Sequence, residues 1–216
     1  MNNNPESSRD EIESHHRNIT FHIAIFASGA GSNAEKIIQH FKSSEFQVAL
    51  IVTNNPRAGV VQIAQKQQIP VLHLYRKKFF EDGYVEEFKD YKIDFIVLAG
   101  FLWMIPQQLI DQYRNKIINI HPALLPKYGG KGMYGNYVHE KVILGKELES
   151  GITIHYVDEH YDHGDIIFQA TCPVFKDDTA ETLASRIHQL EHHHYPRIIE
   201  ELLIRLKGKA ASTDTA

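Results

Sequence analysis

Short apolar runs alternate with segments of helical spacing along the first half of this chain. The apolar runs cover residues 21–27, 46–54, 70–74, 94–100 and 117–121. The segments between them, whose apolar residues recur every three to four positions, cover 34–41, 58–68, 79–91 and 106–114. Parallel strands are joined by such crossover helices and are apolar because both their faces are covered. The pattern therefore predicts an α/β fold with a Rossmann-like open, mostly parallel sheet and helices on both faces.

The pattern changes after residue 121. A helix is expected over 137–145, and two strand-like runs, 151–157 and 165–175, flank the turn-rich loop DEHYDHGD. This arrangement predicts an antiparallel C-terminal portion. A long last helix is expected over 178–206, with Asp178 or Thr179 as its cap and Glu181 in its first turn. We expect one domain over 21–207, a flexible N-terminal extension over 1–20 and a flexible tail over 208–216.

Composition excludes several classes of protein. The formal net charge of −4 argues against a nucleic-acid partner, and no apolar run approaches the roughly 20 residues of a membrane span. Residues 1–20 lack the apolar region of a secretory signal, and the single cysteine, Cys172, fits a packed residue in a cytoplasmic protein. Three histidines stand at 192–194, but consecutive helical residues fan out by about 100°. We therefore expect no metal there.

A glycine-rich turn, FASGAGSN, follows the first apolar run and precedes a helix. Open α/β sheets bind phosphate at such a turn, because glycines let the backbone approach and the helix N-terminus offers free N–H groups. Gly31, Ser32 and Asn33 are the candidate phosphate ligands. The turn matches neither GxGxxG nor GxxxxGK[ST], so a monophosphate fits better than a dinucleotide. The alternative is a tight turn without a ligand.

Polar residues interrupt the apolar stretch IINIHPALLP. Asn119 and His121 are two residues apart, so on a strand both side chains point to one face. In a parallel sheet they lie at the carboxyl end, where ligands bind. An amide and an imidazolium form a donor pair that can hold an oxyanion, and Pro122 and Pro126 stiffen the exit from the strand. The alternative is a pair of polar residues satisfied within the protein.

Carboxylates crowd the loop DEHYDHGDII, residues 158–167. One of them could orient a histidine, raise its pKa and take up a proton. The alternative is an ordinary acidic turn.

Four motifs together resemble the formyltetrahydrofolate-dependent formyltransferases. They are SGAGSN, LAGF at 98–101, NIHPALLPKY at 119–128 and YDHGDII at 161–167. The resemblance runs through roughly 21–205 and is strongest to the small, single-domain glycinamide ribonucleotide formyltransferases of purine synthesis. It implies that Asn119, His121 and Asp162 are catalytic, with Asp162 keeping His121 protonated. It also implies substrate-phosphate contacts at Gly31, Ser32 and Asn33, a ribonucleotide contact at Glu191, and a folate pocket formed by Leu102, Trp103, Met104, Ile105, Asn119, Asp158, Glu159, His160, Tyr161 and Asp162.

The reaction implied by the resemblance moves the formyl group of 10-formyltetrahydrofolate to the amine of glycinamide ribonucleotide, without a metal. The amine is the nucleophile, so no nucleophilic Ser or Cys is needed. Trp103 stands where many members of the family have an arginine. A second arginine, which meets the glutamate tail of the folate in some members, has no counterpart near residues 79–84. Arg76, Lys77 or Lys78 could take its place.

Other functions remain open at the level of sequence. Formyltetrahydrofolate hydrolases share the three catalytic residues but carry an extra N-terminal domain, for which residues 1–20 are too few. Methionyl-tRNA formyltransferases add a basic C-terminal domain, and sugar-nucleotide formyltransferases are longer. A non-catalytic folate- or phosphate-binding module is an alternative of another class. The partners expected are small molecules, and the oligomeric state is left open, with a homodimer as one option.

Overall fold

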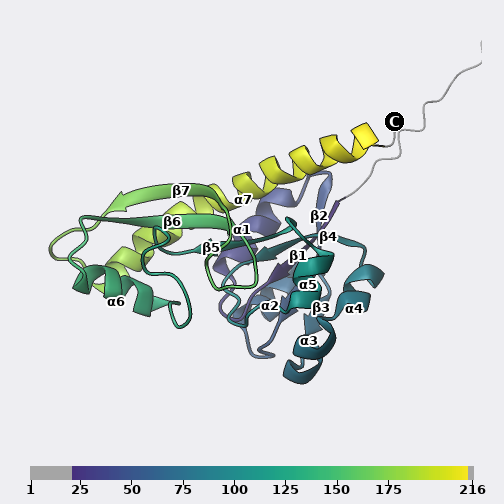
Figure 1. Ribbon diagram of the computed structural model, residues 1–216, viewed down its shortest axis with the longest axis horizontal. Helices are drawn as coiled ribbons and strands as arrows, with labels where there is room; N and C mark the ends of the chain where they lie inside the picture. Colours follow the sequence, from purple (N-terminus) through teal and green to yellow (C-terminus); the bar gives the residue numbers. More distant parts are fainter. Residues whose placement is uncertain (1–20, 214–216) are drawn as a thin grey trace, which may run out of the picture.

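The computed structural model describes residues 21–213 and forms one seven-stranded sheet (Figure 1). Its strand order is β3-β2-β1-β4-β5-β6-β7. The strands are β1 Phe21–Phe26, β2 Phe46–Thr53, β3 Val71–His73, β4 Ile93–Leu98, β5 Ile117–His121, β6 Glu149–Tyr156 and β7 Ile166–Pro173. Each of the seven predicted apolar runs is a strand.

The first five strands run parallel, and β6 and β7 are antiparallel to their neighbours. The predicted mostly parallel sheet with an antiparallel C-terminal portion is therefore confirmed. From β1 the chain first winds outward to β2 and β3, and then returns to place β4 on the other side of β1. In open α/β sheets such a reversal leaves a crevice beyond the carboxyl ends of the two central strands.

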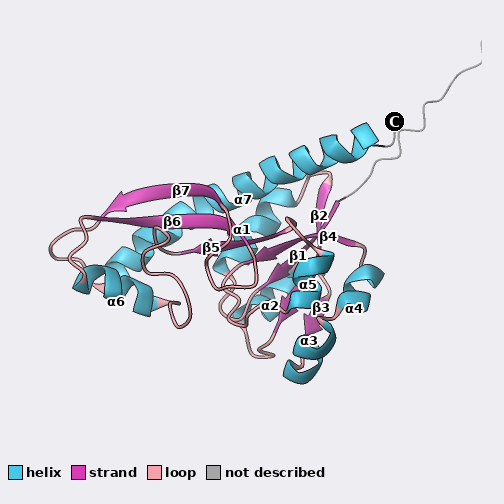
Figure 2. Ribbon diagram, viewed as in Figure 1, coloured by secondary structure: helices cyan, strands magenta, loops and turns pink. Residues whose placement is uncertain are grey.

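Helices cover both faces of the sheet (Figure 2). Alternate residues of β1 show the two layers: Ile23 and Ile25 belong to one apolar core, whereas Ala24 and Phe26 belong to the other. None of the helices within 21–213 is long and apolar enough to cross a membrane. The first face packs against α1 Ser32–Phe41, α2 Gly59–Lys66, α6 Asn136–Leu144 and α7 Ala180–Thr213, and the second against α3 Arg76–Asp82, α4 Val85–Asp90 and α5 Gln107–Gln112.

Two of the helix predictions need correction. The single helix expected over 79–91 is two helices, because Gly83 and Tyr84 have φ values of 69° and 55° and so leave the right-handed helical region. Tyr84 fixes this break: its N–H donates to Asp82 and its hydroxyl accepts the N–H of Tyr75. The last helix does not end near 206 but continues to Thr213, into the segment expected as a tail. Residues 1–20, expected as an extension, lie outside the described residues.

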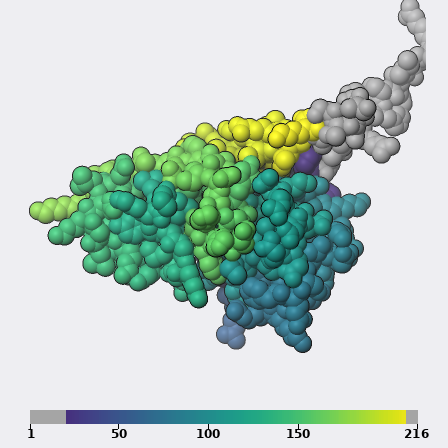
Figure 3. All heavy atoms as spheres, in the orientation of Figure 1, coloured from purple at the N-terminus to yellow at the C-terminus, as the bar shows by residue number. Residues whose placement is uncertain are grey.

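Helix α7 crosses the sheet and is fixed to it by Tyr195. In Figure 3 the helix forms one border of the molecule. The side chain of Tyr195 is fully buried, and its hydroxyl donates to the carbonyl oxygen of Leu98 at 2.9 Å. Leu98 is the last residue of β4, so this bond places the preceding turn of α7, which carries Glu191, at the carboxyl end of the sheet. Cys172 is buried and free, as predicted.

Candidate active site

A cavity of about 730 Å³ opens at the carboxyl ends of β1, β4 and β5. Its size is in the range of small-molecule sites. The turn after β1, the segment after β4, the end of β5, the glycine-rich loop 129–135, the loop after β6 and one turn of α7 all contribute to its wall. The candidate catalytic, phosphate, ribonucleotide and folate-pocket residues named from the sequence line this cavity except Glu159, which is exposed. The three candidates for the folate tail, Arg76, Lys77 and Lys78, lie outside the lining.

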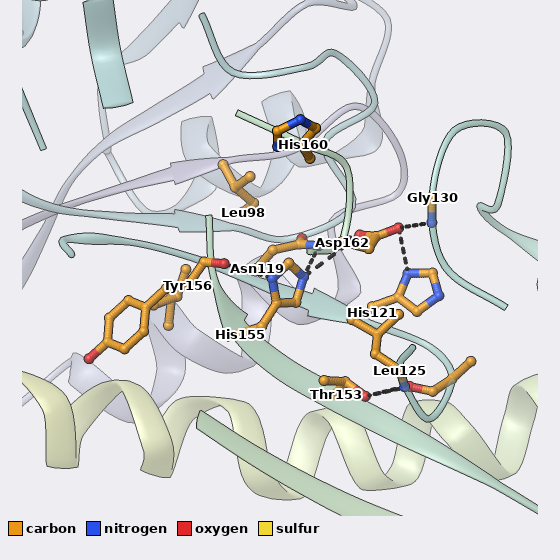
Figure 4. Close-up of polar contacts among 12 residues, drawn as sticks. Leu98, Asn119, His121, Leu125, Gly130, Thr153, His155, Tyr156, His160 and Asp162 are labelled. Atoms are coloured by element: carbon orange, nitrogen blue, oxygen red, sulfur yellow. Dashed lines mark hydrogen bonds and ion pairs between the residues drawn. The ribbon is translucent and has the colours of Figure 1, made fainter. Parts of the chain in front are cut away.

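Asn119 and His121 both meet Asp162 (Figure 4). The amide nitrogen of Asn119 lies 3.4 Å from Oδ1 of Asp162, and Nδ1 of His121 lies 3.5 Å from Oδ2. Asp162 reaches them because its backbone is left-handed, with φ at 54°, and because its Oδ2 accepts the N–H of Gly130 at 2.9 Å. The three residues that the motifs singled out thus form one group, with the carboxylate between the amide and the imidazole.

His155 joins this group, although the sequence analysis did not single it out. It stands directly opposite Asn119 in the antiparallel pairing of β5 and β6. Its Nδ1 lies 2.8 Å from the carbonyl oxygen of Tyr156 and donates to it, so in the neutral ring Nε2 is the acceptor. The same Nε2 lies 3.7 Å from Oδ1 of Asp162. Nε2 lies 3.1 Å from the amide nitrogen of Asn119. The predicted antiparallel pairing was the signal that could have found His155, because it places a histidine beside Asn119.

Burial and Asp162 act in opposite directions on the pKa of His121, which the sequence analysis expected Asp162 to raise. Burial lowers the pKa of His121 below its ordinary value of 6.5, and Asp162 with the carbonyl of Tyr128 offsets only part of that effect. The direction of this shift favours the neutral imidazole at pH 7. Both ring nitrogens nevertheless face acceptors, since Nε2 lies 2.8 Å from the Tyr128 carbonyl oxygen and Nδ1 faces Asp162. A proton that arrived at this ring would find a partner on each side.

Asp162 is a carboxylate. Burial alone would raise its pKa, but the two imidazoles of His155 and His121 and the N–H of Gly130 together lower the pKa below 3.8. The group therefore offers a fixed negative charge beside a neutral imidazole, which is an arrangement suited to accepting and holding a proton.

The glycine-rich turn forms the opposite end of the cavity. Gly31 has φ at 84°, and a Cβ there would lie 2.8 Å from Cβ of Val60, so this position requires glycine. No side chain of the described residues caps α1, and its first-turn N–H groups remain available for an anion. The amide of Asn33 donates to the buried Glu191 at 2.9 Å, and its Oδ1 has no partner within 21–213. The predicted phosphate and ribonucleotide contacts are thus neighbours in space.

Two further histidines stand at this end. His188 lies 2.8 Å from the Glu191 carboxylate, and this hydrogen bond raises the pKa of His188. His139, on α6, is buried, and burial lowers its pKa to about 4. Both line the cavity, as does Lys131 of the glycine-rich loop. None of the three was predicted as a site residue, because only the folded arrangement of α6 and α7 brings the two histidines to the cavity.

The segment after β4 forms an apolar wall. The N–H of Leu102 donates to Ser28 at 3.1 Å, which fixes the start of this segment against the turn after β1. Trp103 packs on the ring of Phe79, and the guanidinium of Arg76 lies 5.4 Å from the centre of the Trp103 ring.

The two lysines that follow Arg76 are both paired with carboxylates. Lys77 pairs with Glu81, and Lys78 pairs with Asp82 and Glu87. Of the three cations considered for the folate tail, Arg76 is therefore the one held beside the cavity wall.

Comparison with known proteins agrees with this geometry. The chain matches the family described as formyl transferase over residues 21–199. It is 42% identical over 187 residues to the chloroplastic phosphoribosylglycinamide formyltransferase of Vigna unguiculata, a match that covers 83% of this chain but only 60% of that protein. It is 38% identical to the phosphoribosylglycinamide formyltransferase of Bacillus subtilis, where the match covers 84% of this chain and 94% of the relative.

Solved structures give the same result. The phosphoribosylglycinamide formyltransferase of Bacillus halodurans superposes with a TM-score of 0.76 at 40% identity and covers 84% of this chain and 95% of its own. Glycinamide ribonucleotide transformylase 1 of Geobacillus kaustophilus superposes with a TM-score of 0.78 at 36% identity, covering 85% and 99%. From the family match and these similarities in sequence and fold, the chain belongs to the formyl transferase family.

Proposed function

We propose that this protein transfers the formyl group of 10-formyltetrahydrofolate to the glycinamide amine of 5′-phosphoribosylglycinamide. The products are formylglycinamide ribonucleotide and tetrahydrofolate, in purine (IMP) biosynthesis. One observation carries the proposal: Asn119, His121 and Asp162 meet in the same cavity as the uncapped N-terminus of α1. A phosphate held at the helix would leave the rest of the ribonucleotide inside the cavity, where its amine can approach these three residues.

The chemistry follows from these groups. The amine nitrogen attacks the formyl carbon, and a tetrahedral intermediate with an oxyanion forms. Asn119 has two amide hydrogens, of which one is held by His155 and the other makes only a 3.4 Å contact to Asp162. The second hydrogen is the one that can turn to the oxyanion. When the carbon–N10 bond breaks, the electron pair returns to N10 and a proton is delivered there.

In our proposal His121 and Asp162 transfer that proton from the amine to N10. The amine loses a proton as its bond to carbon forms, and the neutral imidazole of His121 can take it up. Asp162 then stabilises the imidazolium through Nδ1. The proton finally passes to N10 of the folate. In this order of steps His121 begins neutral and becomes charged during the reaction, which fits its lowered pKa.

The folate occupies the other end of the cavity in our proposal. Leu102 and Met104 expose apolar side chains there, and Asp158 and His160 face them from the loop after β6. We assign Arg76 to the glutamate tail. Replacing it in Arg76→Ala should raise the KM for the folate several-fold with little change in kcat, whereas Lys77→Ala should leave both unchanged.

We place this activity in the single domain formed by residues 21–207. The substrates are small molecules, and the free Cys172 agrees with a reducing compartment, so we propose the cytoplasm as the location.

A spectrophotometric assay of folate deformylation tests the function. Signal that requires glycinamide ribonucleotide and is abolished in His121→Ala supports the transferase. Deformylation without any amine acceptor would identify a hydrolase instead. Binding of both ligands without turnover would identify a non-catalytic module.

A further inference from the structure

We propose that the loop after β6 binds one divalent transition-metal ion of the zinc type through Asp158, His160 and His163. One oxygen or nitrogen atom from each of these side chains lies within 4.8 Å of the other two. Among the described residues this is the group of histidine and acidic side chains that converges closely enough to hold an ion. The inference concerns binding alone and does not rest on the proposed transferase activity.

The loop is fixed before any ion arrives. Its two ends are joined by the N–H of Tyr156, which donates to the carbonyl of Asp165 at 2.9 Å. Gly164 passes so close to the backbone of Tyr156 that a Cβ there would lie 2.0 Å from the Tyr156 carbonyl oxygen. The backbone between Tyr156 and Gly164 is therefore restricted to a narrow range of conformations. A closed loop of this kind loses little entropy when its side chains bind.

Within the loop, the carboxylate of Asp158 uses its two oxygens differently. Oδ1 accepts the N–H of His160 at 2.8 Å, which fixes the side chain. Oδ2 faces Nδ1 of His163 at 3.0 Å, and the rings of His160 and His163 lie 5.4 Å apart. Oδ2 and two imidazole nitrogens therefore surround one point at the end of the loop. An ion there would replace the Asp158–His163 hydrogen bond with two coordinate bonds.

The set of donors decides the class of ion. Two imidazoles and one carboxylate favour Zn²⁺ and similar first-row ions, whereas Mg²⁺ and Ca²⁺ prefer oxygen ligands. Ligands of tetrahedral zinc lie about 2.0–2.2 Å from the metal and so somewhat over 3 Å from one another. Small rotations of the two histidines achieve this, since both are exposed at the surface. The exposed side of His163 leaves the fourth position to water.

This site is separate from the group around Asp162. In Figure 4 His160 lies apart from Asn119, His121 and His155. Asp162 nevertheless lies between His160 and His163 in the chain, and Asp158 and His160 also line the cavity. An ion would therefore hold the loop that carries Asp162 at the rim of the cavity, without entering the proton transfer described above.

Zinc binding to the full chain tests the inference. The protein is freed of metal with EDTA, dialysed and titrated with ZnCl₂ in a calorimeter. We expect one equivalent of Zn²⁺ to bind to the wild type and to raise its Tm. His163→Ala should weaken that binding at least tenfold and abolish the rise in Tm. This residue is 74% exposed in its side chain and outside the cavity lining, so its replacement should leave folding intact.

His193→Ala is the matched control, because it removes an exposed histidine on α7. It should bind Zn²⁺ as the wild type does. The main rival is the stacked pair of His188 and His192, whose rings lie 6.1 Å apart on α7. If His192→Ala abolishes binding while His163→Ala retains it, the ion belongs to α7 and the inference is wrong. Equal binding by the wild type and His163→Ala would also overturn it.

Discussion

At the scale of single residues, the orientation of Asn119 is set by a chain of hydrogen bonds. The carbonyl of Tyr156 fixes the tautomer of His155, and the acceptor nitrogen of His155 then fixes which end of the Asn119 amide faces the cavity. In the proposed reaction His155 therefore acts through Asn119, as a positioning residue. Its effect should be visible in turnover although it need not touch either substrate.

The first prediction concerns this coupling. His155→Ala should lower kcat by about 10-fold or more, because losing an oriented oxyanion donor costs on the order of 10²–10³ in rate. In the double variant His155→Ala/Asn119→Ala the loss should equal that of Asn119→Ala alone, since both changes remove the same interaction. His22→Ala, at the opposite end of β1, is the control and should leave kcat unchanged. Losses that multiply in the double variant would contradict the coupling.

The second prediction concerns the charge of His121. In an NMR titration of the unliganded protein His121 should titrate below 6.5, because burial lowers its pKa. Asp162→Asn should lower this pKa further, since the carboxylate is the main group that raises it. His188 is an internal reference in the same spectrum: it should titrate above 6.5 in both proteins, because Glu191 raises its pKa. A His121 that titrates above 6.5 would contradict our order of proton transfer.

The motifs singled out Asn119, His121 and Asp162, which the fold brings together, but they did not indicate the lowered pKa of His121. A motif carries the identity and spacing of residues, and these place an imidazole near a carboxylate. The pKa depends on how completely water is removed from the ring, and only 3% of His121 remains exposed after the whole fold has formed. His155 was missed for a related reason, because its role exists only once β6 pairs with β5.

At the scale of elements, the two residues that were predicted as caps of α7 have different contacts. Thr179 accepts the N–H of Thr182 at 3.3 Å and so caps the helix, and Glu181 lies in its first turn, both as expected. Asp178, the other candidate, binds both guanidinium nitrogens of Arg186 and the N–H of Phe175. It therefore ties the end of β7 to the second turn of α7.

The third prediction follows from that contact. Asp178→Asn should lower the free energy of unfolding at pH 7 by about 1–3 kcal/mol, the usual range for a hydrogen bond to a charged group. The Arg186 guanidinium holds the pKa of Asp178 well below 3.8, so the stabilisation is present above that pH and is lost as the pH falls through the lowered pKa.

Urea unfolding at pH 7, pH 5 and pH 3 measures this effect. The deficit of the variant should be the same at pH 7 and pH 5 and smaller at pH 3. Asp177→Asn, which changes the exposed neighbouring carboxylate, is the control and should unfold as the wild type does. A deficit at pH 5 well below that at pH 7 would show that another group is responsible.

Most helices and strands could be predicted from the sequence, but the break between α3 and α4 and the end of α7 could not. Apolar periodicity identifies strands and helices because burial follows it. The break between α3 and α4 depends on hydrogen bonds of Tyr84 to residues on either side, which periodicity does not encode. The continuation of α7 to Thr213 was not predicted because residues 208–213, GKAAST, carry no periodic apolar pattern.

At the scale of the whole molecule, the cavity lies where the parallel and antiparallel halves of the sheet meet. The end that we assign to the phosphate belongs to the turn after β1 and to α7, and the group around Asp162 belongs to β5, β6 and the loop after β6. In our proposal the cavity therefore has two binding ends, with the reacting group between them. Each end should bind its ligand in the absence of the other.

The last prediction uses this independence. Glycinamide ribonucleotide alone should raise the Tm of the wild type, because a ligand at 100 times its Kd stabilises a protein by about 2.7 kcal/mol. Glu191→Gln should reduce this rise and leave the rise caused by the folate unchanged, since Glu191 and Asn33 lie only at the phosphate end. Glu200→Gln is the control, because Glu200 is on the same helix and pairs with His40 outside the cavity lining. It should keep both rises in Tm.

His121→Ala is the last variant of this experiment. It should keep the rises in Tm caused by the ribonucleotide and by the folate, but it should lose turnover. That outcome would separate binding from chemistry, and it would show that the reacting group adds little to holding either ligand. If His121→Ala lost the ribonucleotide-dependent rise together with turnover, His121 would be needed to form the binding site itself. The proton transfer that we assign to it would then have to be carried by another group, and the neutral His139, buried at the same end of the cavity, would be the next to replace.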